Sequence, residues 1–139
     1  MTEPTASVEA DLKHTVERFL AAIGRHDLDA VAELFVDEAS IGIVSLREGR
    51  WTTRTLTIEA FLAGLREEAD PVHYTEPVHH FVVLAEEGRL AFVRADATLV
   101  IGDEPRRHNI DYFTLINLDG AWKFISASYV GKPIDEAVV

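Results

Sequence analysis

The second half of this chain consists of four strand-like stretches joined by very short turns, and no other feature constrains the fold as strongly. The stretches cover about residues 76–85, 89–101, 107–118 and 121–130, and the turns between them read EEGR, GDEPR and LDGA. Turns of this length join antiparallel neighbours, and Asp-Gly is a preferred pair for a two-residue hairpin. The pattern therefore predicts an antiparallel meander in which the Asp-Gly turn fixes the register of the last two strands.

Helical patterns occupy much of the first half. Apolar residues recur at helical spacing over residues 8–23, and Gly24 follows as a stop signal. Asp27 is a good N-cap for a second, shorter helix, and Thr57 can cap a third helix that runs to Glu67. Helices followed by a long meander are typical of an α+β fold, in which three helices pack on one face of a curved antiparallel sheet.

Two further strands are expected between the second and third helices, because the stretches ASIGIVSL and RWTTRTL flank a turn at REG. A chain of 139 residues, 47% of them hydrophobic, is the size of one ordinary globular domain. We therefore expect a single domain over residues 8–132, a disordered N-terminus at residues 1–7 and a C-terminal tail at residues 133–139.

Charge and cysteine content exclude several classes of function. Twenty-four acidic against thirteen basic residues give a net charge of -11, which repels phosphate backbones and anionic lipids, so neither nucleic acid nor membrane is an expected partner. No stretch has the pattern of a leader peptide or the roughly 20 apolar residues of a membrane span, and we expect a cytoplasmic protein. The chain has no cysteine, which excludes thiolate chemistry and disulfides. Its six histidines form no pair with metal-ligand spacing, so we expect neither a metal nor a cofactor.

The strand that starts near Arg89 has one face of small apolar residues, which suits helices lying close against the sheet. That face carries Ala91, Val93, Ala95, Ala97 and Leu99. The opposite face mixes apolar residues with Arg94 and Asp96, and it is too apolar to be left wholly to water. A homodimer through this sheet face would cover it. Arg94 and Asp96 would then be an ion pair within the dimer interface, or alternatively a polar anchor for a ligand.

The order of elements and several motifs resemble a known superfamily. The motifs are HDLDAVAELF followed by DEASI, TLTIEAFLAGL in the middle, and DYFTLINLDGAWKF near the end, and they span about residues 8–132. They resemble the nuclear-transport-factor-2-like (NTF2-like) superfamily, and within it the “putative lumazine-binding” and SnoaL-like group. This resemblance implies a cystatin-like α+β cone, a deep apolar pocket between sheet and helices, and dimerisation through the sheet. The superfamily hosts isomerases, dehydratases, cyclases and binding proteins, so the resemblance implies a pocket more than one activity.

Asp111 is the candidate catalytic residue. It shares a strand face with Phe113 and Leu115, and if that face looks inward the pKa of the carboxyl should rise toward the working range of a general base. The placement resembles that of an Asp in ketosteroid isomerase, a member of the same superfamily. The alternative is a structural carboxylate that accepts hydrogen bonds from a neighbouring arginine or backbone amide.

The candidate ligand-binding residues are mostly aromatic. Trp51 follows a hairpin expected at the pocket mouth, Tyr129 has a polar handle, and Phe113 shares the face of Asp111. His26 and His79 come from other elements, and either can form a dyad with Asp111. These five residues would line an aromatic pocket for a small apolar or ring-shaped molecule.

Three functions follow from this pattern. The leading prediction is a small-molecule-binding domain with an apolar, aromatic-lined pocket and an unidentified ligand. The alternative is a cofactor-independent isomerase, dehydratase or cyclase that uses Asp111 as general base. A third is an interaction module whose cone is filled by Phe35, Phe61 and Phe113.

Overall fold

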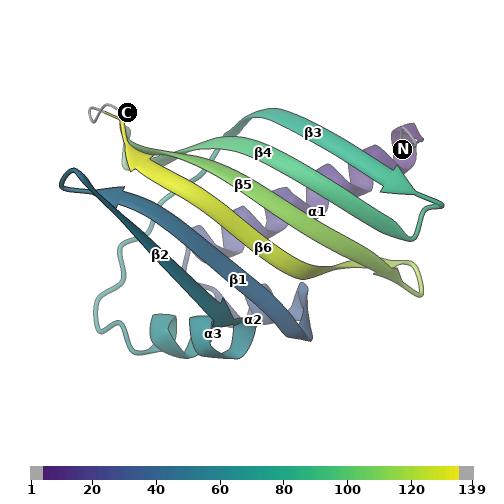
Figure 1. The fold of residues 1–139 in the computed structure, drawn as a ribbon, viewed down its shortest axis with the longest axis horizontal. Helices are drawn as coiled ribbons and strands as arrows, with labels where there is room; N and C mark the ends of the chain where they lie inside the picture. Colours follow the sequence, from purple (N-terminus) through teal and green to yellow (C-terminus); the bar gives the residue numbers. More distant parts are fainter. Residues whose placement is uncertain (1–4, 135–139) are drawn as a thin grey trace.

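A computed structural model describes residues 5–134 and shows a twisted six-stranded sheet with three helices on one side of it (Figure 1). In chain order the elements are α1 (Ala6–Gly24), α2 (Leu28–Glu33), β1 (Phe35–Arg47), β2 (Arg50–Thr57), α3 (Ile58–Arg66), β3 (Val78–Glu86), β4 (Leu90–Ile101), β5 (Glu104–Leu118) and β6 (Ala121–Pro133). The predicted α+β class is confirmed. The predicted disordered N-terminus and C-terminal tail lie largely outside the described residues.

The helices begin where the capping residues predict. The Asp27 carboxylate accepts a hydrogen bond from the backbone N–H of Ala30 at 3.2 Å, and the Thr57 hydroxyl accepts one from the N–H of Ala60 at 3.0 Å. Each bond satisfies a backbone donor that the first helical turn leaves without an intrahelical partner. α1 begins at Ala6, two residues before the predicted start, and α3 ends one residue before the predicted Glu67.

The strand order in the sheet is β2-β1-β6-β5-β4-β3. The predicted meander is confirmed as β3 to β6, and both residues of its last turn have positive φ, 53° at Asp119 and 94° at Gly120, as a two-residue hairpin requires. The sheet differs from the predicted antiparallel one at a single seam, because β1 pairs with β6 in parallel. No local sequence signal marks that pairing, since it joins residues such as Ser40 and Ser126 that are far apart in the chain.

The inner face of the sheet carries the core. Ala91, Val93 and Ala95 of β4 are at most 3% exposed and belong to the same buried cluster as Leu12 and Val16 of α1. Their small side chains let the helix approach the sheet closely, as the alternation of β4 predicts.

Four phenylalanines form the aromatic part of this core. The rings are those of Phe19, Phe35, Phe113 and Phe124, with centroids 5.0 to 5.7 Å apart in the contacting pairs. Trp122, directly after the last turn, is also buried. Two of the three rings expected to fill the cone, Phe35 and Phe113, are therefore in packed core.

The outer face of the sheet is partly apolar. Leu90 and Tyr112 are 46% and 47% exposed, and the Tyr112 ring lies 5.7 Å from that of Phe92. Arg94 donates a hydrogen bond from Nε to Asp96 Oδ1 at 3.0 Å, so these two residues form an ion pair within one chain. Among the described helices, none combines the length and apolar character needed to cross a membrane.

Candidate ligand-binding site

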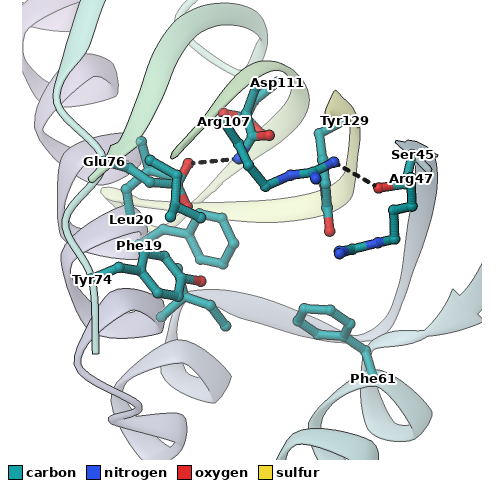
Figure 2. A pocket seen from close by; sticks show the side chains of 13 residues that line it. Phe19, Leu20, Ser45, Arg47, Phe61, Tyr74, Glu76, Arg107, Asp111 and Tyr129 are labelled. Carbon is teal, nitrogen blue, oxygen red and sulfur yellow. Dashed lines mark hydrogen bonds between the residues drawn. The ribbon is translucent and has the colours of Figure 1, made fainter. Parts of the chain in front are cut away.

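A cavity of about 240 Å³ lies between the inner face of the sheet and the helices (Figure 2). Its apolar wall comes from Phe19, Leu20 and Ile23 of α1 and from Phe61 of α3. Phe61 therefore borders the empty space instead of filling it, and a cavity remains beside the phenylalanine core.

The strand β5 supplies much of the polar wall. Arg107, Asn109 and Asp111 alternate along it and all point to the inner face, because successive side chains of a strand point to opposite faces. Tyr129 of β6 lies directly opposite Asp111 in the antiparallel register and lines the same cavity. The outermost polar residue of the lining is Arg47 of β1, whose side chain is exposed.

The irregular segment between α3 and β3 adds Tyr74 and Glu76 to the cavity. It is attached to α1 by the hydrogen bond from Tyr74 N–H to the Gly24 carbonyl at 2.9 Å. It is attached to β4 by two backbone bonds between Thr75 and Val100, at 3.0 and 2.8 Å. Gly24 permits this docking, because a Cβ there would collide with the Tyr74 carbonyl oxygen.

Hydrogen bonds order some of the polar side chains and leave one carboxyl oxygen unsatisfied. Asn109 donates from Nδ2 to Glu76 Oε2 at 3.3 Å, and Arg107 donates from Nη2 to Ser45 Oγ at 3.1 Å (Figure 2). Asp111 is only 5% exposed, yet its Oδ2 has no hydrogen-bond partner among residues 5–134. Buried polar atoms are nearly always paired, so an unpaired one that borders a cavity indicates a place for a ligand atom.

The surroundings of the two acids in the cavity raise the pKa of each. Burial raises the pKa of Asp111 well above its usual range, and the nearby Glu76 and Asp96 carboxyls raise it further. Burial also raises the pKa of Glu76, while the hydrogen bond from Asn109 opposes that rise.

The two tyrosines keep their protons for the same reason. Burial is the main cause of the raised pKa of Tyr74, followed by the charge of Glu76. Burial and then Glu76 and Asp111 also raise the pKa of Tyr129, against the opposing effect of Arg47 and Arg107. Both hydroxyls therefore remain available as hydrogen-bond donors around neutral pH.

The sequence-predicted residues divide into two groups. Asp111 and Tyr129 come together in the cavity, with Phe113 in the packed core next to them. The other three lie outside the lining of this cavity. Trp51 is 45% exposed on the edge strand β2, and the ring of His79 is hydrogen-bonded to Thr98 Oγ1 at 2.6 Å.

His26 occupies the turn between α1 and α2, with a φ of 61°. Its part in a ligand site stays a prediction, as do those of Trp51 and His79. Within residues 5–134, no group of three or more His, Cys, Asp or Glu side chains is arranged to hold a metal ion.

Sequence reasoning missed Glu76, Asn109 and Arg107. A signal existed for the last two, because they share the parity of Asp111 on one strand. For Glu76 no periodic signal existed, because it lies in an irregular segment whose position depends on contacts with α1 and β4.

Comparison with protein-family models shows to which family the chain belongs. The family model described as “Putative lumazine-binding” matches residues 7–130. The chain belongs to this family. No curated protein sequence matches it at a significant level.

Solved structures show the same NTF2-like fold. A protein with a cystatin-like fold from Nostoc punctiforme superposes with a TM-score of 0.74 at 12% identity, covering 96% of this chain and 97% of that one. An NTF2-like protein from Silicibacter pomeroyi gives a TM-score of 0.64 at 20% identity, with 91% and 98% covered. An NTF2-like protein from Novosphingobium aromaticivorans gives 0.69 at 13% identity, with 95% and 85% covered. Together with the family match, these structures confirm the expected cystatin-like, NTF2-like fold.

Proposed function

We propose that this NTF2-like domain binds a small ring-containing molecule in the cavity beside Asp111. The observation that carries the proposal is the unpartnered Oδ2 of Asp111, a buried acceptor at the wall of a cavity of about 240 Å³. Aromatic side chains supply the shape of the site, and Phe19, Phe61 and Tyr129 are well placed to contact a flat ring. Such a site needs shape and a few orienting polar groups, and it has both.

The test is a pH titration of the Asp111 carboxyl by NMR, with and without a library of cyclic ketones and fused-ring heterocycles. We expect the raised pKa to move when a member of the library binds, and Asp111→Asn to weaken that binding. Asp103→Asn, at the exposed β4–β5 turn, is the charge-matched control. A carboxyl that responds to no library member would remove Asp111 from the site.

A second candidate function is proton abstraction, in an isomerase, dehydratase or cyclase. Asp111 as base would remove a proton alpha to a carbonyl, and the protonated hydroxyl of Tyr74 or Tyr129 would donate to the developing oxyanion. The raised pKa values of all three groups support this reading, since a carboxylate with a raised pKa is a stronger base and a tyrosine with a raised pKa keeps its proton for donation.

Deuterium exchange separates the enzyme from the binder. In D₂O, an enzyme would exchange the alpha protons of a bound cyclic ketone, and Asp111→Asn would abolish the exchange while Asp103→Asn would not. Binding without exchange would support the binder alone.

We also propose that the chain forms a homodimer through the outer face of the sheet. The exposed apolar side chains of Leu90 and Tyr112, with the neighbouring Phe92, support this assignment. A cytoplasmic location likewise stays a prediction from the sequence.

A further inference from the structure

The two carboxyl groups of Asp111 and Glu76 line the same cavity close enough to interact electrostatically, and neither has a cationic partner among the described residues. Asp111 is 5% exposed and Glu76 is partly buried. The hydrogen bond to Glu76 comes from the neutral amide of Asn109, and Asp111 Oδ2 receives none. Buried carboxyls without a counter-ion are costly, and a ligand that supplies the missing charge recovers that cost on binding.

Two arginines, Arg47 and Arg107, line the cavity, and the described hydrogen bonds of Arg107 go to β1. Arg107 donates to Ser45 Oγ at 3.1 Å and to the Leu46 carbonyl at 3.4 Å, both in β1. Figure 2 shows its side chain extended toward Ser45 and away from Glu76. Arg47 is exposed, whereas Asp111 is buried.

The charged and titratable groups around Asp111 come from four strands and from the segment between α3 and β3. They are Asp96 of β4, Arg107 of β5, Tyr129 of β6, Arg47 of β1, and Tyr74 and Glu76 of the segment between α3 and β3. The α1 and α3 residues of the lining are all apolar. The two acids thus line the cavity together with apolar and phenolic groups, whereas Arg47 belongs to β1 and Arg107 is hydrogen-bonded to β1.

We propose that this cavity takes a ligand whose buried end carries a protonated nitrogen, held by Asp111 and Glu76 as its counter-ions. The inference rests on the proposed binding function and adds to it the chemical class of the ligand, a small cyclic or aromatic amine or amidine. Rings from Phe19, Phe61, Tyr74 and Tyr129 line the same space and offer faces that attract a cation. The net charge of -11 favours the approach of cations over anions.

The size of the cavity limits the probes. At about 240 Å³ it is below the range of roughly 300–1,000 Å³ that is usual for drug-sized ligands, so single-ring compounds are the right choice. Benzylamine and benzamidine are cationic, while benzyl alcohol and benzamide have nearly the same shape without the charge.

The experiment is isothermal titration of the whole chain with these four compounds at about pH 8, because a higher pH favours the ionised form of carboxyls whose pKa is raised. We expect each cation to bind at least about tenfold more tightly than its neutral counterpart. Repeating the titration in buffers of different ionisation enthalpy should reveal proton release, because a bound cation favours the ionised carboxyls.

Isosteric variants test whether the carboxyl groups of Asp111 and Glu76 produce the preference for cations. Asp111→Asn and Glu76→Gln should each reduce the preference for the cation, and the double variant should abolish it. The control is the double variant Asp103→Asn with Glu104→Gln, which has the same net charge but changes only two exposed residues, one in the β4–β5 turn and one at the start of β5. Thermal unfolding checks that all four variants fold.

The outcomes separate this inference from the proposed function. If neutral compounds bind as tightly as the cations, or if the preference survives in the pocket double variant, the inference is overturned and the binding function stands. If neither these compounds nor the ketone and heterocycle library binds, both are overturned.

Discussion

At the scale of single residues, the alternation of side chains between the two faces of a strand is more informative about the site than the identity of any one side chain. Parity places Asp111 on the same strand face as Phe113 and Leu115 but leaves open whether that face looks inward, and the structure shows that it does. Parity does not reveal whether a carboxyl finds a partner, because partners come from other elements. The unpaired Oδ2 could therefore be recognised only once β5, β6 and the α3–β3 segment were placed together.

The raised pKa of Asp111 makes stability depend on pH with a definite sign. The unfolded carboxyl titrates near ~3.9, and the folded one at a higher pH, so between these values the folded state binds more protons than the unfolded state. The stabilising contribution of the protonated group is complete below the unfolded pKa and is lost as the pH rises through the folded pKa.

We therefore predict that Asp111→Asn is more stable than the natural chain at neutral pH, and that this advantage shrinks as the pH falls toward about 4. Urea unfolding across that range measures the effect. Asp103→Asn should instead follow the natural chain. Curves for Asp111→Asn and the natural chain that stay parallel would mean that burial does not perturb this carboxyl.

At the scale of elements, the helices and the meander were predictable because their signals are local. Caps at Asp27 and Thr57, the apolar spacing of α1 and the Asp119-Gly120 turn each act within a few residues. The α3–β3 segment has no such signal. It is positioned by its contacts with Gly24 and Val100, and that is why Glu76 was missed as a site residue.

Gly24→Ala tests how this segment is held. The added Cβ would collide with the Tyr74 carbonyl, a backbone atom that cannot rotate away, so we expect a loss of about 1–3 kcal/mol in the free energy of unfolding. Binding in the cavity should weaken as well, because Tyr74 and Glu76 move with the segment. Urea unfolding and ligand titration measure the two effects.

Gly64→Ala provides the matched control within a helix. A Cβ at Gly64 meets nothing within 4 Å, and alanine in α3 should stabilise the chain by roughly 0.5–1 kcal/mol without changing ligand binding. Equal effects of the two substitutions would show that Gly24 has no special role in docking the segment.

At the scale of the whole molecule, the sheet separates two environments. Its inner face holds the core and the cavity, while its outer face presents apolar side chains that the alternation of β4 had already suggested to be partly covered. The alternation of a strand predicts that such an apolar face exists. It does not predict which surface covers that face, because the cover depends on the shape of the whole sheet and on association with another chain.

We predict that Tyr112→Asp weakens self-association by at least about tenfold, because a charge without a partner would be buried in the interface. Tyr112 is 47% exposed in the single chain, so the substitution should leave folding intact. Sedimentation equilibrium measures the effect. Trp51→Ser, which removes an aromatic residue of similar exposure from the edge strand β2, is the control. A natural chain that stays monomeric at all concentrations would refute the dimer.

The parallel seam between β1 and β6 also determines when the protein can complete its fold during synthesis. β1 lies inside the sheet, yet one of its two neighbours is the last strand of the chain. Until the ribosome has released β6, β1 has only β2 beside it, and its other edge is open to pairing with strands of other nascent chains. We therefore expect the interval between the synthesis of β1 and that of β6 to be the stage at which the open edge of β1 is most exposed to pairing with other chains.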